Sequence, residues 1–85
     1  MKNPPYEHLT TAKWNSLGKT MTLKDALDCW WNSIRVRTSK GILCCYKCHD
    51  NTYEHDGIRL NRTITLDNEY DEDADGYPIV FATAK

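Results

Sequence analysis

The clearest pattern of apolar and polar positions in this chain is helical. After Thr22, apolar side chains recur with the spacing of one helix face, at Leu23, Ala26, Leu27, Trp30 and Ile34. Thr22 and Asp25 resemble a capping box in which Asp takes the place of the usual Glu. These features predict an amphipathic helix over residues 22–33.

A less regular pattern precedes this helix. Leu9, Ala12 and Leu17 would line one side of a short helix over residues 6–18, which Gly18 would end. Several Thr, Asn and Ser residues in this stretch are poor helix formers. We therefore expect one or two helices in the N-terminal part of the chain.

Beyond the second helix the period of the pattern changes to two. Apolar and basic side chains alternate from Ile34 to Thr38, which is typical of a strand with one buried face. Two short runs, Ser39-Lys40-Gly41 and Asp56-Gly57, are typical of hairpin turns. We expect strands over residues 34–38, 42–48, 58–66 and 78–84.

These elements predict an α+β fold in which one or two N-terminal helices pack on a four-stranded antiparallel β-meander. The chain has 85 residues, which is the size of one small domain covering 1–85. Its three Trp, five Tyr and one Phe can bury enough area to form a core.

The net charge of −1 conceals an uneven distribution of charged residues. Residues 1–66 are mildly basic, whereas residues 67–76 hold six carboxylates and no basic side chain: Asp67, Glu69, Asp71, Glu72, Asp73 and Asp75. Clustered carboxylates can imitate phosphate spacing and speed the encounter with a basic surface. We predict that this acidic segment is a protein-contact surface.

Two other interpretations of the acidic segment remain open. Mutual repulsion of like charges favours a solvated loop between strands. The spacing of Asp71, Asp73, Asp75 and Gly76 also matches the opening of a calcium loop. However, the Glu that should close such a loop is replaced by Ala82.

Basic side chains on the predicted strands offer an alternative function. Arg35 and Arg37 have the same parity, so they project from one sheet face, and we expect Lys47 and Arg59 on that face in neighbouring strands. With nearby tyrosines, such a face would suit RNA or another nucleic acid. A solvated outer face is the simpler interpretation.

Thiols and imidazoles are concentrated in one short stretch. Cys45 and Cys48 have the gap of a zinc knuckle, and His49 and His55 complete a candidate metal set. A second matched ligand pair is missing from the sequence. We therefore expect no cofactor, with a zinc-stabilised interaction domain as the alternative. In the simpler interpretation, Cys44 and Cys45 pack as small apolar residues.

The same stretch, Cys45-x-x-Cys48-His49, also matches the attachment pattern of c-type haem. Haem attachment takes place outside the cytosol, and the N-terminal residues lack the apolar core of a signal peptide. We expect a cytoplasmic protein with reduced thiols. The longest apolar runs are too short to cross a membrane, so we expect no membrane association.

No catalytic motif with a phosphate loop, a nucleophile elbow or a metalloprotease helix occurs in the chain. A small ribonuclease built on His49 and His55 is conceivable, but nothing in the spacing requires it. We therefore predict a protein that is not an enzyme.

The short, aromatic-rich chain with its concentrated acidic segment resembles, in style, phage or mobile-element accessory proteins that bind and inhibit a host factor. The resemblance implies an inhibitor that occludes a host macromolecule through residues 67–76. The expected partner is a host protein, with a nucleic-acid-binding protein as one candidate, and RNA is the alternative. The sequence predicts no oligomeric state.

Overall fold

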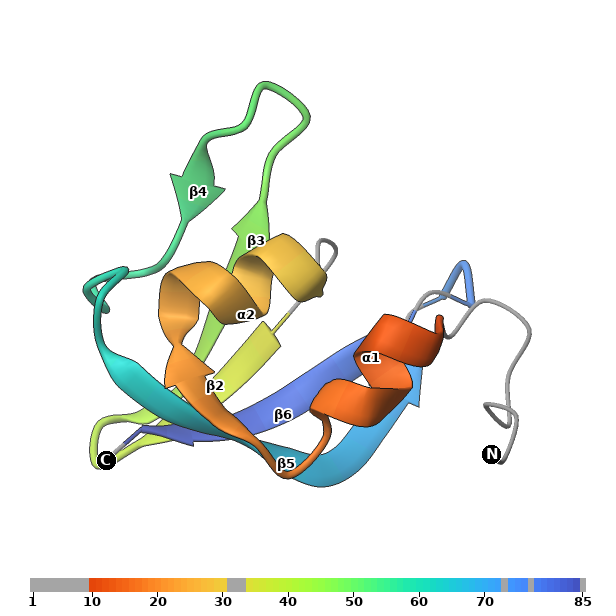
Figure 1. Cartoon of the computed structure of the whole chain (residues 1–85). Coiled ribbons are helices and arrows are strands. Elements are labelled where there is room, and N and C mark those ends of the chain that lie inside the picture. The colour runs from red at the N-terminus through yellow and green to blue at the C-terminus, as the bar shows by residue number, and fades with distance from the viewer. Residues whose placement is uncertain (1–9, 31–33, 73, 77, 85) are drawn as a thin grey trace.

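The computed structural model describes residues 10–30, 34–72, 74–76 and 78–84. Within these residues, two short helices lie against one face of a curved six-stranded sheet (Figure 1). In chain order the elements are α1 (Thr11–Ser16), β1 (Thr20–Thr22), α2 (Leu23–Cys29), β2 (Ile34–Thr38), β3 (Gly41–Lys47), β4 (Tyr53–Glu54), β5 (Thr63–Glu72) and β6 (Pro78–Ala84). The predicted α+β class is confirmed.

The strand order is β1-β5-β6-β2-β3-β4, so the predicted four-stranded antiparallel meander is wrong. β6 enters the sheet between β5 and β2 and runs parallel to β2, whereas the other neighbouring strands are antiparallel. Alternation along a strand shows which of its faces is buried but does not name its neighbours. The insertion of β6 depends on contacts between distant parts of the chain.

The predicted strand 58–66 and acidic loop 67–76 are also corrected. Residues 58–62 lie outside the strands, with a turn at residues 60–61, and the strand β5 begins at Thr63 and continues to Glu72. β6 supplies an antiparallel partner along this length, with a bulge between Leu66 and Tyr70. The charged residues of β5 remain in the ladder because a sheet with one solvated face tolerates them.

The two helices begin where the sequence indicates a cap. The backbone N–H of Asp25 donates to Thr22 Oγ1 over 3.2 Å, and that of Lys13 donates to Thr10 Oγ1 over 3.2 Å. Both helices are shorter than predicted, because α2 ends at Cys29 and α1 occupies only Thr11–Ser16. The predicted helical residues 6–9 and 31–33 lie outside the described part of the chain.

The core lies between α2 and the sheet. The predicted apolar face of α2 is fully buried, and Trp30 is the largest fully buried side chain among the described residues. The sheet contributes a matching layer of fully buried side chains: Ile34, Val36, Cys45, Ile64, Leu66, Val80 and Ala82. The indole Nε1 of Trp30 donates to Ser16 Oγ over 2.8 Å, which joins α1 to α2 within the core.

Candidate interaction surface

The face of the sheet that lies opposite α1 and α2 is the candidate interaction surface, called the outer face below. On β2, Ile34 and Val36 are buried on the helix side, so Arg35 and Arg37 project from the outer face. The register of the strands then arranges the outer-face residues in rows that cross the sheet.

The end of the outer face nearest the β5–β6 hairpin carries an aromatic and an acidic residue. Cys45 and Val80 both lie opposite Ile34 with their side chains on the helix side, so Tyr46 and Ile79, next to them along their strands, project from the outer face. Asp71 is the partner of Ile79 across the β5–β6 ladder. The register therefore brings Tyr46, which is 45% exposed, to the same end of the outer face as the acidic residues of β5.

The next rows are mixed in character. One row contains Cys44, Arg35 and Phe81, and the following row contains Ile42, Arg37 and Thr83. Ile42 is 56% exposed; with Tyr46 it is one of two large hydrophobic residues that are exposed in the described part of the chain. Single exposed apolar side chains of this kind can serve as anchors when a partner covers them.

Arg37 binds two residues of the acidic segment. Its guanidinium donates to Asp67 Oδ2 over 2.7 Å and to Glu69 Oε2 over 3.0 Å, and its Cζ lies 4.7 Å from the centre of the Phe81 ring. The Thr83 hydroxyl also donates to Asp67. Two of the six predicted contact carboxylates, Asp67 and Glu69, are therefore engaged within the sheet.

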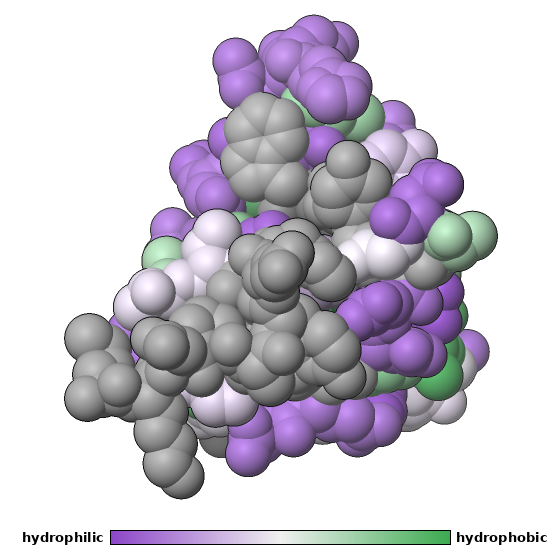
Figure 2. Space-filling model, turned by 90° about the vertical axis from the view of Figure 1, so that its right-hand side faces the viewer, coloured by the Kyte–Doolittle hydropathy of each residue, from purple (hydrophilic) through white to green (hydrophobic). Residues whose placement is uncertain are grey.

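The other described carboxylates of the segment gather at the end of the hairpin. We call Asp71, Glu72 and Asp75 the acidic tip; all three are exposed, and Asp73 lies outside the described residues. The backbone N–H of Glu72 donates to Asp71 Oδ1 over 2.8 Å. Figure 2 shows the side of the molecule that carries this hairpin, where hydrophilic residues dominate the described surface.

The structure separates the four basic residues predicted for nucleic-acid binding. Arg35 and Arg37 share the outer face, as predicted. Lys47 lies on the helix side, where its Nζ donates to Asp28 Oδ1 over 3.1 Å, and Arg59 lies in the turns before β5. The parity of β3 explains the position of Lys47, because it follows the buried Cys45 by two residues.

Lys47 belongs to a polar cluster that fastens α2 to β3 and β4. Asp28 accepts hydrogen bonds from the Tyr53 hydroxyl over 2.6 Å, from Lys47 Nζ over 3.1 Å and from Lys24 Nζ over 3.0 Å. The amine Nζ of Lys24 lies 5.8 Å from the centre of the Tyr53 ring, and that of Lys47 lies 5.7 Å from it. These contacts, with the Tyr53 hydroxyl the largest contribution, lower the pKa of Asp28 to about 2.

Replacing Asp28 with asparagine is expected to lower stability in a pH-dependent way. The folded pKa lies below the ordinary value of 3.8, so the stabilisation is fully present above that value and is lost as pH falls toward about 2. Because the carboxylate is partly exposed, we expect a difference of about 1 kcal/mol in the free energy of unfolding at neutral pH. Urea unfolding across this pH range measures it.

Glu54→Gln is the control for this prediction, because it neutralises an exposed carboxylate on the neighbouring strand β4. The free energy of unfolding of this control should differ little from that of the wild type, and the difference should not depend on pH. An Asp28→Asn variant whose destabilisation does not decrease toward low pH would show that the carboxylate charge does not stabilise this cluster.

The candidate metal residues have different environments. Cys45 is fully buried in the core, and burial raises the pKa of its thiol to about 11. His55 uses Nδ1 to contact the carbonyl oxygen of Ile58, Cys48 is half-buried and His49 is exposed. Within the described ranges, no three His, Cys, Asp or Glu side chains are placed to share a metal ion. The zinc site therefore remains a prediction.

Comparisons with protein-family models, with curated proteins and with solved structures each found no significant match to this chain. In the part of the chain that the structure describes, no helix has the length and apolar character needed to cross a membrane. The residues of the outer face and the acidic tip are therefore the features from which we infer a function.

Proposed function

We propose that this chain is a non-enzymatic binding protein that binds a basic surface of a partner protein through its acidic tip. One observation carries the proposal: the end of the β5–β6 hairpin bears three exposed carboxylates, Asp71 and Glu72 in the ladder and Asp75 in the turn, at the same end of the sheet as the exposed Tyr46. A charged cluster at the same end of the sheet as an aromatic anchor can both attract a partner and hold it.

The hairpin lowers the cost of presenting these charges. Backbone pairing of Asp71 with Ile79 and of Glu72 with Pro78 fixes the part of β5 that carries two of the three carboxylates. Less conformational freedom is then lost when a partner binds than for a disordered acidic tail. Arg37 offsets the charge of Asp67 and Glu69, which lie in β5 before the tip.

The proposed mode of action is occlusion of a host macromolecule, as a phage-type accessory protein would act. A partner that normally holds nucleic acid in a basic cleft has the complementary charge for three neighbouring carboxylates. To block such a cleft, the protein needs only affinity for it and enough volume to exclude the nucleic acid, and no chemical step is required. The two alternatives, RNA binding and a zinc-stabilised interaction domain, remain predictions.

A short polylysine peptide, used as a model of a basic surface, tests where such a partner docks. In a titration followed by backbone amide NMR, we expect the largest shifts at residues 71–76 and at Tyr46. Residues 67–69 should shift less because Arg37 already occupies their carboxylates. Raising the salt concentration should weaken binding, since screening acts on exposed charges.

A polyglutamate peptide of the same length is the control and should leave the amides of the acidic tip unchanged. Shifts spread evenly over all exposed carboxylates, including Asp25 and Glu54, would contradict the proposed docking site. Shifts confined to residues 67–69 would also contradict it, because they would show that the peptide displaces Arg37.

A further inference from the structure

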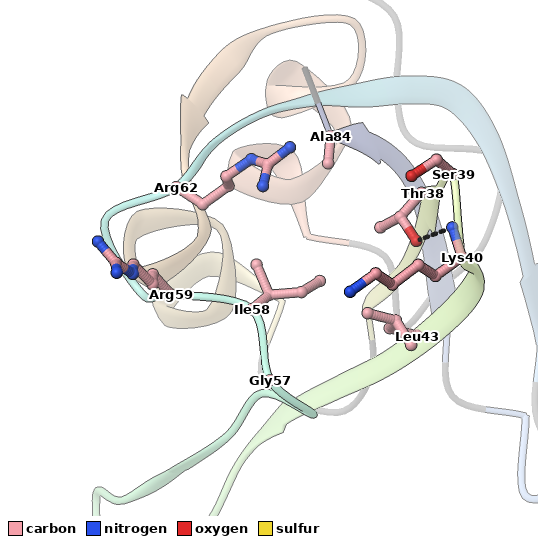
Figure 3. A pocket seen from close by; sticks show the side chains of 9 residues that line it. All are labelled: Thr38, Ser39, Lys40, Leu43, Gly57, Ile58, Arg59, Arg62 and Ala84. Atoms are coloured by element: carbon pink, nitrogen blue, oxygen red, sulfur yellow. Dashed lines mark hydrogen bonds between the residues drawn. The ribbon is translucent and has the colours of Figure 1, made fainter.

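A pocket at the opposite end of the sheet from the acidic tip has the chemistry of an anion site. The pocket has a volume of about 460 Å³ and lies between the β2–β3 turn, the turns before β5 and the end of β6 (Figure 3). Its lining residues are Thr38, Ser39, Lys40, Leu43, Gly57, Ile58, Arg59, Arg62 and Ala84. This volume is in the range of small-ligand sites.

The described residues that line the pocket carry charge of one sign. The described residues that line it include three cations, Lys40, Arg59 and Arg62, and no carboxylate. In Figure 3 the Lys40 amine points across the pocket toward Ile58, and the Arg62 guanidinium extends toward Ala84. The Arg59 guanidinium lies on the other side of its loop in this view, so Lys40 and Arg62 are the two groups that face the space.

Hydrogen bonds fix the two turns that carry these cations. Thr38 Oγ1 accepts from the backbone N–H of Lys40 over 3.1 Å and donates to the carbonyl oxygen of Gly41 over 2.9 Å. On the other side, the backbone N–H of Leu23 donates to the Arg62 carbonyl oxygen over 2.9 Å. The main chain on both sides of the pocket is therefore ordered before any ligand arrives, which reduces the cost of binding.

The pocket also has an apolar part. Leu43, Ile58 and Ala84 line it, and Ile58 is nearly buried, with 6% of its surface exposed. A guanidinium and an ammonium suit a phosphate group, because guanidinium can bind two oxygens at once and ammonium acts as a point charge. The apolar lining would contact the organic part of a ligand that carries such a phosphate.

We propose that this pocket binds a small phosphate monoester, of the size of a mononucleotide, with Lys40 and Arg62 holding the phosphate. The ligand's organic group lies against Leu43 and Ile58. The site is independent of the function proposed above, since it shares no residue with the acidic tip or with Tyr46. The molecule then carries a basic pocket at one end of the sheet and an acidic tip at the other.

Calorimetric titration with adenosine monophosphate, adenosine and inorganic phosphate tests the proposal. We expect the monophosphate to bind most tightly, inorganic phosphate more weakly because it lacks the apolar contact, and adenosine not to bind. Lys40→Gln and Arg62→Gln should each lower the affinity for the monophosphate by about tenfold, the loss typical of one hydrogen bond to a charged group. Neither change alters a backbone hydrogen bond of the turns.

Lys19→Gln is the matched control, because Lys19 is exposed and lies just before β1, outside the pocket. It should leave the affinity for the monophosphate unchanged. Equal affinities of the wild type for the monophosphate and for adenosine would overturn the proposal. It would also be overturned if Lys40→Gln and Arg62→Gln bound the monophosphate as tightly as the wild type and the Lys19→Gln control. Binding of a short single-stranded RNA without binding of the monophosphate would also overturn it, because the site would then recognise a polymer.

Discussion

Replacing Trp30 with alanine is expected to lower the free energy of unfolding by about 3–5 kcal/mol. Trp30 is fully buried between α2 and the sheet, so its removal leaves a cavity that the surrounding strands can fill only in part. The change also removes the hydrogen bond from the indole to Ser16, which joins α1 to the core. A small domain has a total stability of about 5–15 kcal/mol, so this loss is a large fraction of it.

Trp14→Ala is the matched control, because Trp14 is half-buried and packs at the margin of the same core. Urea unfolding followed by circular dichroism compares the two variants with wild type. The Trp14 variant should lose much less stability than the Trp30 variant. Equal losses, or a Trp30 variant as stable as wild type, would contradict the assignment of Trp30 as the centre of the core.

The elements with short-range signals were predicted well. The position of α2 follows from the Thr22 cap and the apolar spacing up to Trp30, all of which lie within nine residues. The strands β2 and β6 match the predicted ranges 34–38 and 78–84, because their alternation or apolar content is local. Two short edge strands, β1 and β4, were missed, since two or three residues give no recognisable period.

Long-range pairing could not be predicted from these patterns. β5 continues from Asp67 to Glu72 because β6 lies beside it and pairs with it. No pattern near Asp67 in the sequence predicts β6 as its partner. The sequence locates the acidic segment as a cluster, but it does not indicate that Asp67 and Glu69 bind Arg37 while the later carboxylates lie at the end of the hairpin. Arg37 can reach Asp67 and Glu69 only because β6 is inserted between β2 and β5.

The basic residues show the same limit. Parity within β2 placed Arg35 and Arg37 correctly on one face. Lys47 was expected beside them, but the hairpin register pairs it with Tyr53 and places it near Asp28. The pocket between Lys40 and Arg62 joins two turns that are far apart in the sequence, so single-strand patterns gave no indication of it.

The central claim is that the acidic tip binds a basic partner, and a charge-reversal variant tests it. Changing Asp71, Glu72 and Asp75 to lysine should abolish the attraction while leaving the core unaltered, because all three side chains are exposed. The matched control changes Asp25, Asp50 and Glu54 to lysine, three exposed carboxylates elsewhere on the molecule. Both variants have the same net charge, so general electrostatic effects cancel in the comparison.

The decisive measurement is quantitative affinity capture of the partner from the source cells by wild type and by these two variants, after thermal melts confirm that each is folded. We predict that the tip variant retains about tenfold less of the partner than wild type, whereas the control variant retains a similar amount. Undiminished retention by the tip variant, or an equal loss with both variants, would contradict the claim that the end of the β5–β6 hairpin is the binding site.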